Sequence, residues 1–116
     1  MMHQKELKNE TTRQYNFLSE MYADTYFPSF LVDKIKNILV ELCFKIEKEQ
    51  PQNLEALYLI THASTEKIND LEQEFYENDS EIETAARDCI GGDFEAVAIA
   101  YGYDADIEML IATRDW

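Results

Sequence analysis

Two predicted helices meet at the stretch Glu72-Gln73-Glu74-Phe75-Tyr76-Glu77-Asn78-Asp79-Ser80-Glu81-Ile82-Glu83. Before it, apolar or small side chains recur in steps of three and four from Leu54 to Phe75, and a second stripe with the same spacing follows it. Side chains with this spacing lie on one face of a helix. The stretch is therefore predicted to join two long helices, at residues 54–77 and 81–101.

The centre of this stretch has the composition of a turn. Asn78, Asp79 and Ser80 carry short polar side chains, which bond neighbouring backbone groups in turns. Ser80 and Glu83 also have the spacing of a capping box, in which each side chain accepts from the backbone N–H of the other residue. We therefore expect Ser80 to be the N-cap of the second helix of this pair.

Charge is distributed unevenly along the chain. Residues 66–108 contain fourteen acidic and two basic side chains, whereas residues 1–65 contain nine and seven, so most of the formal net charge of −14 lies in one segment. Glu74 and Glu77 lie near the predicted C-terminus of a helix, where the helix dipole disfavours anions. Because a broken local rule often accompanies function, residues 72–83, which we call the acidic corner, are the first candidate for a functional surface.

Further helices are predicted on both sides of this pair. Residues 14–23 are expected to form a short first helix and residues 29–49 a long second one, which ends because Pro51 disfavours helix at the residue before it. A final short helix is expected after Asp104 as its N-cap. The long helices have apolar stripes of the kind that pack together, so the sequence predicts an all-α fold, an antiparallel bundle of about four helices with short terminal helices.

Two glycines leave one detail of the bundle open. Gly91 and Gly92 fall inside the predicted fourth helix, where each costs about 1 kcal/mol relative to alanine. They either kink one helix, let another helix approach closely, or split the element in two. Gly102 is expected to end the helix as its C′ residue. The domain division expected is a flexible N-terminal segment at residues 1–13 and a single helical domain at residues 14–116.

Composition excludes several classes of function. The strong negative charge argues against binding the phosphate backbone of nucleic acids or an anionic membrane surface. Cys43 and Cys89 are expected to be free buried thiols, since they lie apart in sequence at apolar-stripe positions. No apolar run approaches the length of a membrane span and no secretory signal precedes the first helix, so we expect a cytoplasmic protein.

Several stretches together resemble a known family. They are Met21-Tyr22-Ala23-Asp24, Tyr26-Phe27-Pro28, Thr61-His62-Ala63, Ala100-Tyr101-Gly102 and Ala112-Thr113-Arg114-Asp115-Trp116, with residues 30–34, 38–43 and 77–87. In these stretches the chain resembles small acidic bacterial proteins catalogued as a domain of unknown function, number 5713. The resemblance covers nearly the whole chain from about Tyr15. It implies a single cytoplasmic bacterial domain, and it brings no activity, cofactor or catalytic residue.

A second candidate site lies on the predicted third helix. His62 and Glu66 are one helical turn apart, so both could reach one metal ion or one water molecule. The other histidine is His3, and no second metal-binding motif accompanies His62. The default interpretation is a hydrogen-bonded histidine on a helix surface. We therefore expect no cofactor and no catalytic residue, with His62 and Glu66 as weak metal candidates.

Three hypotheses of function follow. The first is a non-enzymatic protein-interaction module that binds a basic protein partner through the acidic corner. Its expected partner-binding residues are Glu74, Glu77, Asp79, Glu81 and Glu83. The alternative is a metal- or small-molecule-binding protein or enzyme that uses His62 and Glu66. The third is a self-associating protein with a homodimer face at residues 22–30, which leaves the oligomeric state as monomer or homodimer.

Overall fold

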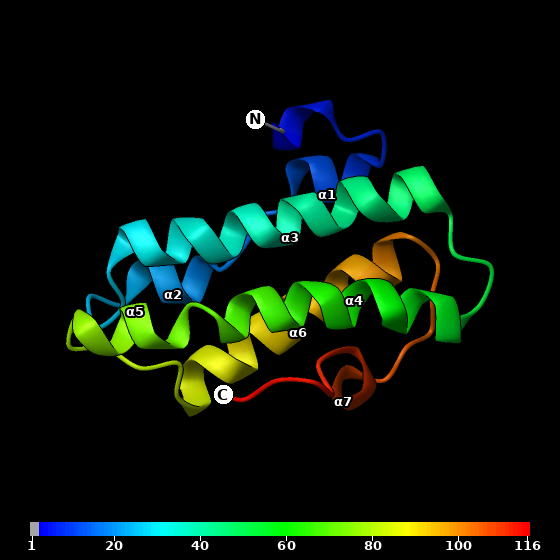
Figure 1. Cartoon of the computed structure of the whole chain (residues 1–116). Helices are drawn as coiled ribbons and strands as arrows, with labels where there is room; N and C mark the ends of the chain where they lie inside the picture. The colour runs from blue at the N-terminus through cyan, green and yellow to red at the C-terminus, as the bar shows by residue number, and fades with distance from the viewer. Residues whose placement is uncertain (1–2) are drawn as a thin grey trace.

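Helices and the turns between them make up the whole described part of the chain, shown in Figure 1. The computed structural model describes residues 3–116, and no strand occurs within that range. The elements are the 3-10 turn η1 (Gln4–Glu6) and the helices α1 (Glu10–Gln14), α2 (Ser19–Ala23), α3 (Ser29–Glu49), α4 (Leu54–Asn69), α5 (Glu72–Glu77), α6 (Thr84–Ala100) and α7 (Ile107–Leu110). α3 and α4 pack side by side in opposite directions, and α6 passes behind α4 in this view. The predicted all-α bundle is confirmed.

α3 is the longest helix, with 21 residues, and its bounds are those that the sequence predicts. Pro28 occupies its N-cap position, where the fixed φ of proline suits the start of a helix. Gln50 ends it in the left-handed conformation with φ of 47°, directly before Pro51. One side of α3 is buried along its whole length, through Leu31, Val32, Ile35, Leu39, Val40, Leu42, Cys43 and Ile46.

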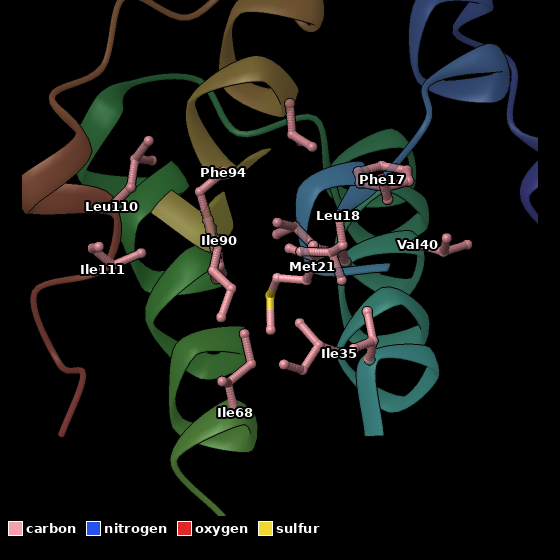
Figure 2. Packing of buried hydrophobic residues seen from close by; sticks show 14 of the residues in the cluster. Phe17, Leu18, Met21, Ile35, Val40, Ile68, Ile90, Phe94, Leu110 and Ile111 are labelled. Carbon is pink, nitrogen blue, oxygen red and sulfur yellow. The ribbon is translucent and has the colours of Figure 1, made fainter. Parts of the chain in front are cut away.

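The core gathers side chains from both ends of the chain. Figure 2 shows Met21 of α2 pointing into the centre of the core, between Ile35 of α3 and Ile90 of α6. Leu110 and Ile111 close the side next to α4 and α6, and both are buried. The last short helix therefore belongs to the core. It begins after Asp106, whose carboxylate accepts from the backbone N–H of Glu108, so the prediction of Asp104 as its N-cap was wrong.

The predicted third helix, residues 54–77, is divided into α4 and α5. α4 begins as predicted, with the side chain of Asn53 accepting from the backbone N–H of Ala56 at 2.8 Å. At the division, the N–H of Leu71 bonds to the carbonyl of Ile68 and forms a tighter turn than an α-helix has. The bend follows Asn69, a weak helix former whose side chain bonds to the backbone of Thr113 and Asp115.

α6 runs through Gly91 and Gly92 without interruption, so the glycines do not split the helix. A Cβ atom at Gly91 would lie 3.2 Å from Cγ2 of Ile107, so this glycine lets α7 approach α6 closely. A Cβ atom at Gly92 would meet nothing within 4 Å. Gly102 ends the helix with φ of 88°, and its N–H bonds to the carbonyl of Ile99, which confirms the predicted C′ glycine.

The predicted first helix, residues 14–23, is wrong as a single element, because α1 and α2 are separate. The cause lies on α6, where the buried carboxylate of Asp93 accepts from the hydroxyl of Tyr15 and the backbone N–H of Leu18, both at 2.7 Å. Leu18 is left-handed, with φ of 56°. Burial raises the pKa of Asp93, although its two hydrogen bonds act to lower the pKa. A contact distant in sequence has overridden the helical pattern.

Part of the segment predicted to be flexible packs against the domain. Leu7 is buried, with 1% of its side chain exposed, and the carboxylate of Glu47 accepts from the backbone N–H groups of Lys8 and Asn9. Tyr101 donates to the same carboxylate at 2.6 Å. Burial acts to raise the pKa of Glu47, but these hydrogen bonds outweigh it and lower the pKa. The first two residues of the segment lie outside the described range, and the domain division at residue 13 stays a prediction.

The two adjacent glycines of α6 provide a matched test of this packing. Gly92→Ala is expected to raise the free energy of unfolding by about 1 kcal/mol, because alanine favours helix and the site has room. Gly91→Ala gains the same helical preference but crowds Ile107, and overpacking costs about 1–3 kcal/mol. We expect Gly91→Ala to be no more stable than the wild type in urea denaturation. Equal stabilisation by both substitutions would contradict the close contact with α7.

Candidate functional site

The acidic corner begins with α5 and turns sharply after it. The backbone N–H of Ser80 bonds to the carbonyl of Phe75 at 2.9 Å, and the N–H of Asp79 bonds to the carbonyl of Tyr76 at 3.2 Å. These two bonds form a Schellman motif, in which the C′ residue is left-handed. That residue is Asp79, with φ of 57°, where glycine is usual. The turn therefore holds a carboxylate where the backbone favours glycine.

The predicted capping box does not form. Ser80 is buried, and its hydroxyl has no hydrogen-bond partner among the described residues. Its backbone N–H is used to close α5, so it belongs to the end of that helix, and α6 begins four residues later with Glu83 as its N-cap. The carboxylate of Glu83 makes no cap hydrogen bond, although its negative charge interacts favourably with the dipole at the N-terminus of α6.

The candidate carboxylates lie on α5, on the turn after it and at the N-cap of α6. Glu77, Asp79, Glu81 and Glu83 are all exposed. Glu74 is half-buried and pairs with Lys34 of α3, with the Nζ and Oε2 atoms 2.6 Å apart. Of the ion pairs within residues 3–116, this is the one that includes a carboxylate of the acidic corner. The corner thus keeps most of its negative charge.

A groove of about 560 Å³ is formed by the acidic corner together with the start of α6, Asp115 and Trp116. It is lined by Glu72, Gln73, Tyr76, Glu81, Ile82, Glu83, Thr84, Arg87, Asp115 and Trp116. Burial, together with the neighbouring charge of Asp115, raises the pKa of Glu72. The Nε of Arg87 donates to the main-chain oxygen of Trp116 at 3.2 Å, and no ion pair between Arg87 and Glu83 is among those of the described chain. The groove has more carboxylates than cations, which suits a positively charged guest.

His62 and Asn69 hold the C-terminal segment against α4. The ring Nε2 of His62 lies 2.7 Å from the carbonyl oxygen of Met109, so it donates in this bond. Asn69 accepts from the N–H of Asp115 at 2.9 Å and donates to the carbonyl of Thr113 at 3.0 Å. These side chains lie two helical turns apart on one face of α4. They place Asp115 next to the groove.

The same contacts bear on the metal hypothesis. Nε2 of His62 carries a proton in its bond to Met109, so Nδ1 is the ring nitrogen left to bind a metal. Glu66 is exposed one turn away. In the part of the chain that the structure describes, no group of three His, Cys, Asp or Glu side chains could hold a metal ion.

Comparison with known proteins places the chain in a family. The model of a family described as "Family of unknown function (DUF5713)" matches residues 11–116. The chain belongs to this family. No curated protein and no solved structure matches the chain. In this DUF5713 protein, the site must therefore be interpreted from its own residues.

Sequence reasoning missed three residues that shape the acidic corner of this DUF5713 protein. Lys34 neutralises Glu74 from another helix, and Asp115 joins the groove from the end of the chain. Tyr76 lies on the exposed side of α5, with 69% of the residue accessible. The helical spacing of Tyr76, one residue after the buried Phe75, could have indicated this exposure. The other two depend on tertiary packing, which periodicity does not report.

The left-handed conformation of Asp79 gives a test of the turn. Asp79→Gly is expected to raise the free energy of unfolding by about 1 kcal/mol, because glycine adopts this conformation without the steric cost. Asp79→Asn is the matched control, since asparagine also tolerates the conformation and removes the same charge. Chemical denaturation would measure both. A glycine variant no more stable than the asparagine variant would contradict the Schellman turn.

The role of His62 and Asn69 can be tested in the same way. His62→Ala is expected to lower the free energy of unfolding by about 1 kcal/mol, and Asn69→Ala by about 1–3 kcal/mol, because each loses contacts to the C-terminal segment. Added Zn²⁺ is expected to leave the thermal midpoints of the wild type and of His62→Ala unchanged. A zinc-dependent rise in the wild type alone would favour the metal alternative.

Proposed function

We propose that this protein is a non-enzymatic interaction module that binds a basic protein partner through the acidic corner. The observation that carries the proposal is the set of exposed carboxylates at Glu77, Asp79, Glu81 and Glu83, with Lys34 engaged by Glu74. Carboxylates of one sign on one surface steer a basic partner towards it and accelerate association. The interaction should weaken as salt rises, since exposed charges are screened beyond about 8–10 Å at ordinary ionic strength.

The groove that the corner forms with Arg87, Asp115 and Trp116 supports the same proposal. Glu72 and Asp115 both line it, and burial of Glu72, together with repulsion from the charge of Asp115, raises the pKa of Glu72. A lysine or arginine side chain placed between them would relieve the repulsion and gain two favourable interactions. Tyr76 offers an exposed ring at the edge of the groove. The groove can therefore receive one basic side chain of the partner, while the exposed carboxylates of the corner contact other basic side chains.

The alternative function has weaker support. A metal- or small-molecule-binding protein or enzyme at His62 and Glu66 would have to use Nδ1 of His62, because Nε2 donates to the carbonyl of Met109. No group of three His, Cys, Asp or Glu side chains in residues 3–116 could hold a metal ion. The proposal also places the protein in the bacterial cytoplasm, and the free thiols of Cys43 and Cys89 accord with a reducing compartment. In residues 3–116, no helix is both long and apolar enough to cross a bilayer.

The proposal predicts that binding of a cationic probe depends on the position of the carboxylates as well as on their number. A corner variant would carry Glu77→Gln, Asp79→Asn, Glu81→Gln and Glu83→Gln. A control variant with the same net charge would carry Glu6→Gln, Glu10→Gln, Glu49→Gln and Glu55→Gln, all at exposed positions outside the corner. Fluorescence anisotropy with a labelled nona-lysine peptide would give the affinities at about 20 mM and about 200 mM salt.

We expect the corner variant to bind the peptide about tenfold more weakly than the control variant at low salt, because four exposed ion pairs are lost. The wild type and the control variant should both lose affinity steeply as salt rises, whereas the corner variant should have the smaller salt dependence. Equal affinities for the two variants would show that net charge alone attracts the peptide, and the proposal would fail.

A further inference from the structure

Three aromatic rings lie exposed where α2 turns into α3. Tyr22, Tyr26 and Phe30 have 38%, 43% and 49% of their surfaces accessible. Phe27, between them in sequence, is buried with 5% exposed, so the connector divides its rings between the core and the surface. We call Tyr22, Tyr26 and Phe30 the aromatic patch. Large rings at the centre of an interface contribute a disproportionate share of binding energy, so an exposed set of them needs an explanation.

Two rings of the aromatic patch are held in place before any partner binds. The hydroxyl of Tyr22 donates to Oδ1 of Asp33 at 2.5 Å. The ring of Tyr26 packs edge to face on the buried Phe27, with ring centres 5.1 Å apart and planes at 76°. A ring that is already fixed loses little conformational entropy when a partner covers it. Two of the three rings of the aromatic patch are therefore preorganised for binding.

The aromatic patch adjoins the acidic corner. Lys34 contacts Glu74 of α5, and Phe30 lies four residues before Lys34 on α3, on the same face of the helix. Figure 1 shows the turn from α2 to α3 at the same end of the bundle as α5. A partner that covers the corner can thus reach the rings without crossing the molecule.

The surroundings of the aromatic patch select the kind of partner. Asp24 accepts from the backbone N–H of Tyr26 and Asp33 accepts from the hydroxyl of Tyr22, and both carboxylates are exposed. Lys34 is paired with Glu74. Rings flanked by carboxylates suit guanidinium, which stacks on aromatic faces and pairs with carboxylates in the same plane. A second copy of this chain fits poorly, because each copy has a formal charge of −14 and would bring its own acidic end into the contact.

We propose that the aromatic patch binds arginine side chains of the basic partner, so that the corner attracts the partner and the rings select arginine over lysine. The inference rests on the proposed function and adds a second contact surface to it. The corner sets the rate of encounter through long-range attraction, whereas the rings act at short range and set the rate of dissociation.

Two peptides of equal charge, nona-arginine and nona-lysine, separate these contributions. The quantity measured is the ratio of their affinities for each protein variant. A patch variant would carry Tyr26→Ala and Phe30→Ala. A control variant would carry Leu59→Ala and Ile99→Ala, which shorten exposed apolar side chains outside the patch. Circular dichroism would confirm that both variants keep the helical fold.

We expect the wild type and the control variant to bind nona-arginine on the order of tenfold more tightly than nona-lysine. The patch variant should lose most of this ratio, while the corner variant described above should weaken both peptides and keep the ratio. An unchanged ratio in the patch variant would overturn the inference and leave the proposed function standing. If neither peptide binds the wild type, both proposals fail. A homodimer in light scattering that the patch variant abolishes would assign the rings to a second copy and would also overturn the inference.

Discussion

The burial of one whole face of α3 constrains where charge can be neutralised. Because Leu31, Ile35, Leu39 and their neighbours on that face must contact the core, the lysines of α3 are confined to its other sides. Lys34 reaches Glu74, and Lys45 lies 4.0 Å from Glu49 within its own helix. Residues 66–108 contain two basic side chains of their own, so the acidic corner stays negative as a consequence of packing.

The C-terminal segment adds to this imbalance. Asn69 bonds to the backbone of residues 113 and 115, and His62 bonds to the carbonyl of Met109. These contacts stabilise the fold, since they satisfy backbone groups that would otherwise need water. They also set Asp115 near Glu72, whose pKa is raised by burial and by the negative charge of Asp115. The contacts that hold the C-terminal segment against α4 therefore also enlarge the electronegative surface.

The bounds of a helix could be predicted from the local sequence where its apolar stripe and its capping residues determine them. α3 has this character, and so does the end of α6 at Gly102. Prediction failed where a distant residue competes with the local pattern. Asp93 divides the first helix through Leu18, and Ser80 closes α5 when its spacing suggests that it caps α6. At the site, the exposed carboxylates could be predicted from the composition of residues 72–83. The groove could not, because it depends on Asp115 and on the bend between α4 and α5, and neither produces a periodic pattern in the sequence.

The central claim is that the acidic corner is the most electronegative surface of the folded protein. The most direct measurement is the relaxation of backbone amide protons by dissolved nitroxides, one cationic and one neutral, in nuclear magnetic resonance. The excess effect of the cation reports the local potential, because a negative surface concentrates it. We predict the largest excess at residues 76–83 and a smaller one along the exposed face of α3. An excess spread evenly over the surface, or largest away from the corner, would contradict the account.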